Sequence, residues 1–290
     1  MTTMKLSGVS TTAQRFVAPF LLVAVLGCEP DRPRLPPTEV QPQIELVQRV
    51  VSENDFLIAG ELTVEALTVL DRTIAGLESQ FGSHSPEVIQ GLIKTSSLLA
   101  SNDHPVAARR YMERALLLNR ELYGLEHRET AYTLHDVAIL LTMETPDIYL
   151  QRAELLFRGA LGVRRKILGA DDPEAAASEV QLAWQLLLAA SKTALAYRKQ
   201  ELLAESEQLA AHAREVFTRN NDTSYQKRIR RILLETAFAR GDFFRVEEIG
   251  QDMVAQGGYE KGPGLYPDMV AEDLLVRAAE QIDRLVVSRP

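Results

Sequence analysis

Three short stretches of this chain, QFGSHSPEV (80–88), LYGLEHRET (122–130) and ILGADDPEA (167–175), share one pattern. Each contains a glycine, and a new helical pattern with an acidic residue near its start follows a few positions later. The glycines are Gly82, Gly124 and Gly169, so their spacings are 42 and 45 residues. Self-similarity at a fixed period of about 20 to 50 residues is typical of repeat architectures.

The residues before each glycine repeat as well. A small residue stands sixteen positions before the glycine and another stands nine before it, with a large apolar residue between them. The first set is Ala66, Ala108 and Ala153, the second set is Thr73, Ala115 and Ala160, and the large residues are Leu70, Met112 and Phe157. Small residues seven apart lie on one stripe of a helix and allow a second helix to approach closely. We therefore expect paired helices that share a seam of small residues.

Helix starts follow the glycines. Ser85-Pro86-Glu87 and Asp172-Pro173-Glu174 each offer a capping side chain, a proline in the first turn and an acid near the positive end of the helix dipole. From about residue 44 the pattern is helical nearly throughout, without sustained two-residue alternation. A later unit has Ser206 and Ala213 at the paired small positions, and we expect its first helix to run long through residues 186–200.

These residues resemble the tetratricopeptide repeat family, in the longer form found in kinesin light chains. TAYTLHDVAILL (130–141) is similar to the first helix of that form, and YLQRAELLFRGALGVRRKILGADDPEA (149–175) to its second helix and linker. The resemblance covers about residues 44–256 and implies an all-α superhelix of about five helix pairs. It also implies a concave wall formed by the first helices. Residues 257–290 are expected to be a loop followed by a capping helix at 267–287, which covers the apolar face of the last repeat.

The composition of the chain argues against several classes of function. The chain has 290 residues and a formal net charge of −8, which disfavours general nucleic-acid binding because such proteins need a basic face. The one cysteine excludes an intramolecular disulfide and the usual cysteine-based metal sites, and the five histidines show no HExxH motif. We expect a protein without catalytic residues, bound metal or cofactor, whose oligomeric state the sequence does not specify.

The N-terminal region gives a hypothesis about location. Lys5 and Arg15 precede FVAPFLLVAVLG (16–27), an apolar run that is too short to span a bilayer but is typical of a secretory signal. The alternative is a buried N-terminal helix. VLGC (25–28) resembles the lipobox of bacterial lipoproteins, which implies cleavage after residue 27 and acylation of Cys28; the alternative is an ordinary unmodified cysteine.

Residues 28–43 comprise this cysteine and a proline-rich tether, and proline at this density favours extended polyproline II. The resemblance further implies a bacterial envelope protein, anchored to the outer membrane and facing the periplasm.

Candidate binding residues lie on the expected first helices. Trp184 is the only tryptophan, and KRIRR (227–231) places Arg228 and Arg231 three positions apart. Aromatic and arginine side chains are frequent anchors of protein interfaces, and paired arginines can hold a carboxylate. The alternatives are a core tryptophan and a solvated charged helix face. By the repeat match, the same wall also carries Gln90, Lys94, Tyr132, Asp136 and Gln181.

We therefore interpret the chain as a membrane-anchored scaffold that binds a protein or peptide segment in its concave groove. Proteins of this kind, by family resemblance, often serve assemblies such as pili, secretion machines or outer-membrane complexes. The alternative function is a regulatory or docking subunit of an envelope enzyme.

Overall fold

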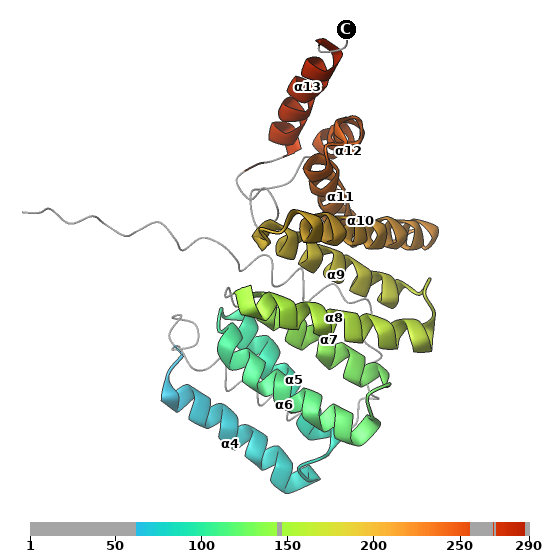
Figure 1. The fold of residues 1–290 in the computed structure, drawn as a ribbon. Coiled ribbons are helices and arrows are strands. Elements are labelled where there is room, and N and C mark those ends of the chain that lie inside the picture. The colour runs from blue at the N-terminus through green and yellow to red at the C-terminus, as the bar shows by residue number, and fades with distance from the viewer. Residues whose placement is uncertain (1–61, 144–146, 256–268, 270, 288–290) are drawn as a thin grey trace, which may run out of the picture.

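The chain folds as a stack of α-helices. A computed structural model describes residues 62–143, 147–255, 269 and 271–287, and within these ranges every regular element is a helix. The helices run in chain order along the stack from α4 to α13 (Figure 1). They are α4 (Val64–Phe81), α5 (Pro86–Ser101), α6 (Pro105–Tyr123), α7 (Arg128–Met143), α8 (Asp147–Leu168), α9 (Pro173–Lys192), α10 (Ala196–Arg219), α11 (Gln226–Arg240), α12 (Phe243–Ala255) and α13 (Ala271–Val287).

These helices form antiparallel pairs, as the repeat predicts. The pairs α5–α6, α7–α8, α9–α10 and α11–α12 each consist of a first and a second helix, and each second helix also packs against the next first helix. Helix α4 is a second helix, and its expected partner in residues 44–61 lies outside the described residues. Helix α13 packs on α12 and closes the C-terminal end, at the place where the sequence predicts a capping helix. The fold is an all-α superhelix.

The predicted seam of small residues is confirmed at five of its six positions; the sixth, Thr73, is only partly buried, and its Oγ1 donates to the Val69 carbonyl at 2.9 Å. Ala108, Ala153, Ala115 and Ala160 are fully buried, and Ala66 is buried as well. The large residues between them, Leu70, Met112 and Phe157, are at most 2% exposed. In α10, Ser206 and Ala213 are also fully buried, and the Ser206 hydroxyl donates to the carbonyl of Ala183 on α9 at 2.8 Å. Because its side chains are small, the seam allows side chains of one helix to contact the backbone of the other. Aliphatic residues fill the space around it.

The repeated glycines have a backbone reason. Gly82, Gly124 and Gly169 have φ of 88°, 87° and 98°, and ψ is 149° at Gly82 and 176° at Gly124. This combination of φ and ψ is open essentially to glycine alone. In each case the glycine N–H still donates to the helix, for example from Gly124 to the Arg120 carbonyl at 3.1 Å. The glycine thus ends one helix and turns the chain into the next.

Both predicted helix caps, at Ser85 and Asp172, are present in the structure. Ser85 Oγ accepts from the Val88 N–H at 3.3 Å, and Asp172 Oδ1 accepts from the Glu174 N–H at 2.8 Å. At the start of α7, His127 takes the corresponding place, and its Nδ1 accepts from the Glu129 N–H at 3.2 Å. The first helices therefore begin at the positions that the sequence predicts.

One prediction about the helices is wrong. The stretch 186–200 does not continue as one long helix, because α9 ends at Lys192 and α10 begins at Ala196. Thr193 turns the chain with extended backbone angles, and its Oγ1 accepts from the Leu195 N–H at 3.3 Å. The break contains neither glycine nor proline, so no strong sequence signal marks it.

Ion pairs join each second helix to the next second helix along the stack. The pairs are Glu78–Arg114, Glu113–Arg152, Glu154–Arg198, Arg158–Glu205 and Glu207–Arg245. They connect α4 to α6, α6 to α8, α8 to α10 and α10 to α12. A single exposed pair contributes little, about 0–1 kcal/mol, and the repetition shows that successive second helices are placed alike in the stack. We refer to this set as the second-helix ladder.

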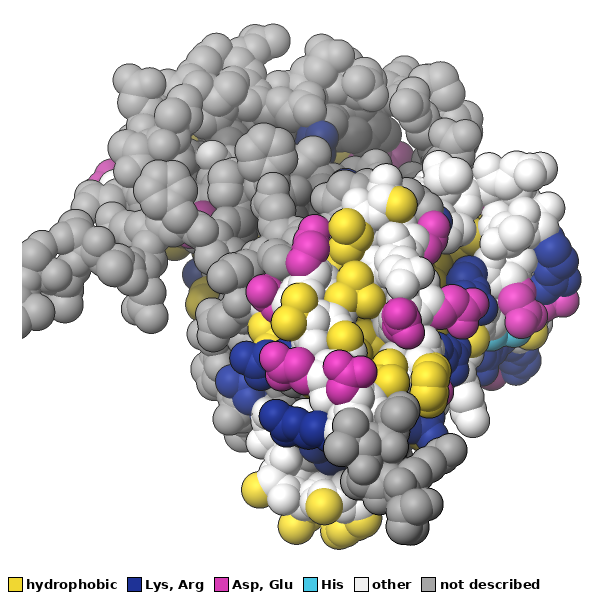
Figure 2. All heavy atoms as spheres, turned by 90° about the horizontal axis from the view of Figure 1, so that it is seen from above, with side chains coloured by type: hydrophobic (Ala, Val, Ile, Leu, Met, Phe, Trp, Pro, Cys, Tyr) yellow, Lys and Arg dark blue, Asp and Glu magenta, His cyan; other side chains and the backbone are white. Residues whose placement is uncertain are grey.

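The surface carries charges of both signs. Seen from above, basic side chains lie among acidic and hydrophobic ones on the part that the structure describes (Figure 2). None of the described helices is both long and apolar enough to cross a bilayer.

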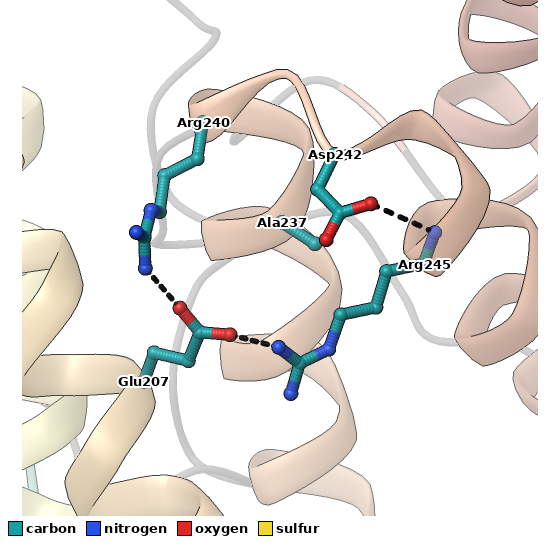
Figure 3. Close-up of a pocket in the computed structure, with 5 residues that line it drawn as sticks. All are labelled: Glu207, Ala237, Arg240, Asp242 and Arg245. Carbon is teal, nitrogen blue, oxygen red and sulfur yellow. Dashed lines mark hydrogen bonds and ion pairs between the residues drawn. The ribbon is translucent and has the colours of Figure 1, made fainter.

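At the last rung of the ladder, Glu207 lies between Arg240 and Arg245 and lines a pocket of about 230 Å³ together with Ala237 and Asp242 (Figure 3). Each charged group there has a partner of opposite sign or a backbone N–H. We therefore assign this pocket to the junction of α10, α11 and α12.

Candidate functional site

Trp184 lies where the first helices α9 and α11 meet. Its neighbour Ala183 is fully buried in the seam, and this places the partly buried Trp184 side chain at the edge of the core. The guanidinium carbon of Arg228 lies 5.6 Å from the indole ring centre, and that of Arg231 lies 5.3 Å from it. Both distances are within the range of cation–π attraction. The structure thus brings together three of the residues that the sequence singles out.

Two further side chains orient the arginines. Arg228 Nη1 donates to Gln181 Oε1 at 2.9 Å, which adds a fourth predicted residue to this group. Arg231 Nε donates to Glu235 Oε1 at 2.7 Å, and the Glu235 side chain is fully buried. Because both guanidiniums are held by hydrogen bonds and by the indole, they lose little freedom when a ligand binds. We call Gln181, Trp184, Arg228, Arg231 and Glu235 the Trp184 cluster.

The remaining cations of KRIRR point elsewhere. Lys227 is exposed, and Arg230 pairs with Asp252 on α12 at 3.2 Å. One turn of helix cannot present all four cations to one side. The hypothesis that Arg228 and Arg231 share one face of α11 therefore agrees with the geometry. Lys227 lies on the solvated side of the helix, and Arg230 lies on the side that faces α12.

Tyr132 belongs to a different group of side chains. It lies on α7 and is buried, and its hydroxyl donates to Glu174 Oε2 on α9 at 2.7 Å. Arg128 Nε contacts both the Tyr132 hydroxyl, at 3.2 Å, and Glu174 Oε2, at 3.3 Å. The guanidinium of the buried Arg164 lies 4.6 Å from the Tyr132 ring centre. Tyr132 thus contributes to the contact between two neighbouring first helices.

The other predicted residues lie along the same row of helices. Gln90 and Lys94 are half-buried on α5, two units before Trp184, and Asp136 is buried on α7, one unit before it. Cys28 lies outside the described residues.

Sequence reasoning missed Glu235 entirely, and it identified Glu174 only as an acid at a helix start, not as the carboxylate that holds Arg128. The four-residue spacing of Arg231 and Glu235 is a usable helical signal. The Arg128–Glu174 pair joins residues 46 apart, and sequence spacing alone does not reveal it.

The arrangement suits recognition better than catalysis. Arginine donors beside an aromatic face match the side chains that dominate protein interfaces. In the described part of the chain, no group of three or more histidine, cysteine, aspartate or glutamate side chains is placed to hold a metal ion. The cluster can offer hydrogen-bond donors and a flat apolar surface to a partner.

Comparison with known proteins supports the fold. No family model matches the chain, and no curated protein matches it. One similar solved structure is that of a point variant of nearly identical TPR-like repeats from a putative kinesin light chain of Podosopora anserina. Its sequence is 17% identical to this chain. It has a TM-score of 0.56 and covers 76% of this chain and 94% of its own.

A second structure of these repeats has a TM-score of 0.54 at 17% identity and covers 76% of this chain and 95% of its own. BtubC (BKLC) from P. vanneervenii has a TM-score of 0.48 at 16% identity and covers 78% and 95%. The Podosopora likeness shows that the chain has a TPR-type repeat fold.

Proposed function

We propose that this protein is a scaffold that binds a segment of another protein on the face formed by its first helices. The observation that carries the proposal is the Trp184 cluster, in which two oriented guanidiniums flank the only tryptophan of the chain. A TPR-type stack supports such a role because its first helices form one continuous surface across several units. The donors of the cluster favour a partner segment that carries a carboxylate, either an acidic side chain or a C-terminus.

We further propose that the scaffold is held to a membrane of a bacterial envelope through Cys28. Support comes from the sequence: an apolar run ends at VLGC, and a proline-rich segment follows. At about 3.1 Å per residue in polyproline II, residues 29–43 would reach roughly 45 Å and hold the repeats away from the bilayer. Replacing Cys28 with Ser is expected to abolish incorporation of labelled palmitate; retained label in that variant would contradict the anchor.

The scaffold proposal is tested with matched variants of α9 and α11. Arg228→Gln and Trp184→Leu remove the cluster's donor and aromatic face, and Lys227→Gln removes a neighbouring exposed charge as the control. Arg231 is left in place because it neutralises the buried carboxylate of Glu235, and an unpaired buried charge would destabilise the fold. We expect partner co-purification to fall at least tenfold, about 1.4 kcal/mol, in both test variants and to persist in the control.

A second measurement uses the single tryptophan. Because Trp184 is the only indole, its fluorescence reports on the cluster without interference. Titration with an acidic peptide is expected to change the emission of the native protein, whereas an amide-substituted peptide of the same length has no effect. Equal responses to both peptides would refute the carboxylate preference, and unchanged co-purification in both test variants would refute the site.

A further inference from the structure

His212 on α10 lies between two carboxylates from different elements. Its Nδ1 is 2.7 Å from Glu179 Oε2 on α9, and its Nε2 is 3.1 Å from Asp171 Oδ1 in the turn between α8 and α9. Glu179 is fully buried and also accepts from Arg165 on α8 at 2.6 Å. One imidazole thus connects α10, α9 and the α8–α9 turn.

This geometry requires two protons on the imidazole. A carboxylate oxygen is an acceptor, so each ring nitrogen must carry an N–H in order to bond its partner. A neutral imidazole has one N–H and could serve only one of the two carboxylates. The other nitrogen would then direct a lone pair at a carboxylate oxygen, which is repulsive.

The positions equivalent to Asp171 in the other two turns also carry residues that form ion pairs. The second residue after each repeated glycine pairs with the end of the next second helix: His84 with Glu121, Glu126 with Lys166, and Asp171 with Arg219. The last pair is 3.2 Å apart. At the third turn His212 adds a further contact, since it reaches both Asp171 and the buried Glu179. A histidine therefore links this turn to a buried carboxylate, a link that the described residues do not show at the other two turns.

We propose that His212 is a pH-operated clamp that fixes the α8–α9 turn against α10 while its imidazole is doubly protonated. When the proton leaves, the remaining N–H stays with buried Glu179, and Asp171 retains Arg219 alone. The turn at residues 169–172 then gains freedom relative to the C-terminal half of α10. This inference concerns the repeat stack itself and holds whether or not the Trp184 cluster binds a partner.

The surrounding charges favour the clamped state. The hydrogen bond to Glu179 raises the pKa of His212 above its usual range, desolvation opposes this, and Asp171 adds a further increase. Arg165 on α8 and Arg219 on α10 face the same two carboxylates and share them with His212. The His212 side chain is 34% exposed, so its proton can exchange with solvent.

The direction of the pH effect follows from the raised pKa. The contribution of the clamp is fully present below the ordinary histidine pKa of about 6.5, and it is lost as the pH rises through the higher value in the folded protein. Each unit by which the folded value exceeds the ordinary one corresponds to about a tenfold difference, between the protonated and the neutral imidazole, in the equilibrium constant for closing the clamp. The clamp thus opens as the pH rises above the ordinary histidine range.

Hydrogen exchange of the full chain tests the clamp. After correction for the intrinsic pH dependence of amide exchange, we expect residues 169–172 to exchange several-fold faster at alkaline than at acidic pH. His212→Gln should remove this contrast, since glutamine does not titrate, and His84→Gln should preserve it as the control. Equal contrast in the native chain and His212→Gln, or no contrast in the native chain, would overturn the proposal.

A direct titration keeps the test valid if His212→Gln folds poorly. In the NMR spectrum of the five imidazoles, the His212 signal should titrate above the ordinary value of about 6.5. Asp171→Asn removes one carboxylate without touching the core and should lower that midpoint. A His212 midpoint at or below the ordinary value, or one unchanged by Asp171→Asn, contradicts the clamp.

Discussion

The repeated glycines allow a sharp test of the fold, because one added methyl group should have opposite effects at two positions. A Cβ built on Gly124 meets no heavy atom within 4 Å, so Gly124→Ala creates no clash. Its φ of 87° and ψ of 176° nevertheless lie in a region that alanine rarely adopts. Such backbone strain costs on the order of 1–3 kcal/mol.

Part of this cost is offset in the unfolded chain. Alanine reduces the conformational freedom of the unfolded state, which stabilises the fold by about 0.4–1 kcal/mol. The net expectation for Gly124→Ala is a loss of about 1–2 kcal/mol in the free energy of unfolding. For a domain of about 150–250 residues, each kcal/mol lowers Tm by about 2–4 °C.

Gly162 provides the matched control. It lies inside α8, its Cβ also meets nothing within 4 Å, and its φ is not positive. Gly162→Ala should therefore stabilise the protein by about 0.5–1 kcal/mol, the usual cost of a glycine inside a helix. Chemical denaturation followed by far-ultraviolet circular dichroism measures both variants. A neutral or stabilising Gly124→Ala, or the same sign for both substitutions, would refute the account of the turn.

Three further predictions follow from the packing and charges. Phe157→Ala should lower the free energy of unfolding by about 3–5 kcal/mol, because it empties a buried site between the small residues of the seam, and calorimetry checks this. Arg158→Gln removes a rung of the second-helix ladder and should cost under about 1 kcal/mol. That cost should shrink further as salt rises from about 0.1 M to 1 M, and an unchanged cost would argue against an ionic ladder. Unfolding measured across pH should show a stability contribution from His212 that falls as the pH rises above about 6.5, and that is absent in His212→Gln.

Much of the fold could be predicted because its determinants are local and recur. The glycines at 82, 124 and 169 mark turns that only glycine makes well, and the small residues before them mark the seam. In the later units, different residues and a different backbone conformation end the helices. Asn221 has φ of 54° and Gly241 has φ of 78°, which is left-handed backbone of a kind that asparagine also adopts. The repeat signal therefore fades toward the C-terminus although the architecture continues.

The candidate site was predictable in part. The three-residue spacing of Arg228 and Arg231 places them on one side of α11, and the repeat match places Trp184 on the adjoining first helix. Their partners depend on the register between units. Gln181 and Arg228 are 47 residues apart, and Tyr132 and Glu174 are 42 apart, so these contacts appear only once the helices are packed. The end of α9 at Lys192 was missed for a different reason: neither glycine nor proline marks the break in the sequence.

The central claim is that the first-helix face around Trp184 receives a protein partner, and position-specific photo-cross-linking in the cells that make the protein tests it most directly. A photoreactive phenylalanine analogue is placed at position 184, and at position 155 on α8, where Leu155 is 71% exposed, as the control. The account predicts a defined cross-linked protein from position 184 that disappears with Arg228→Gln and is absent from position 155. The same products from both positions, or a cross-link at 184 that Arg228→Gln leaves unchanged, would contradict it.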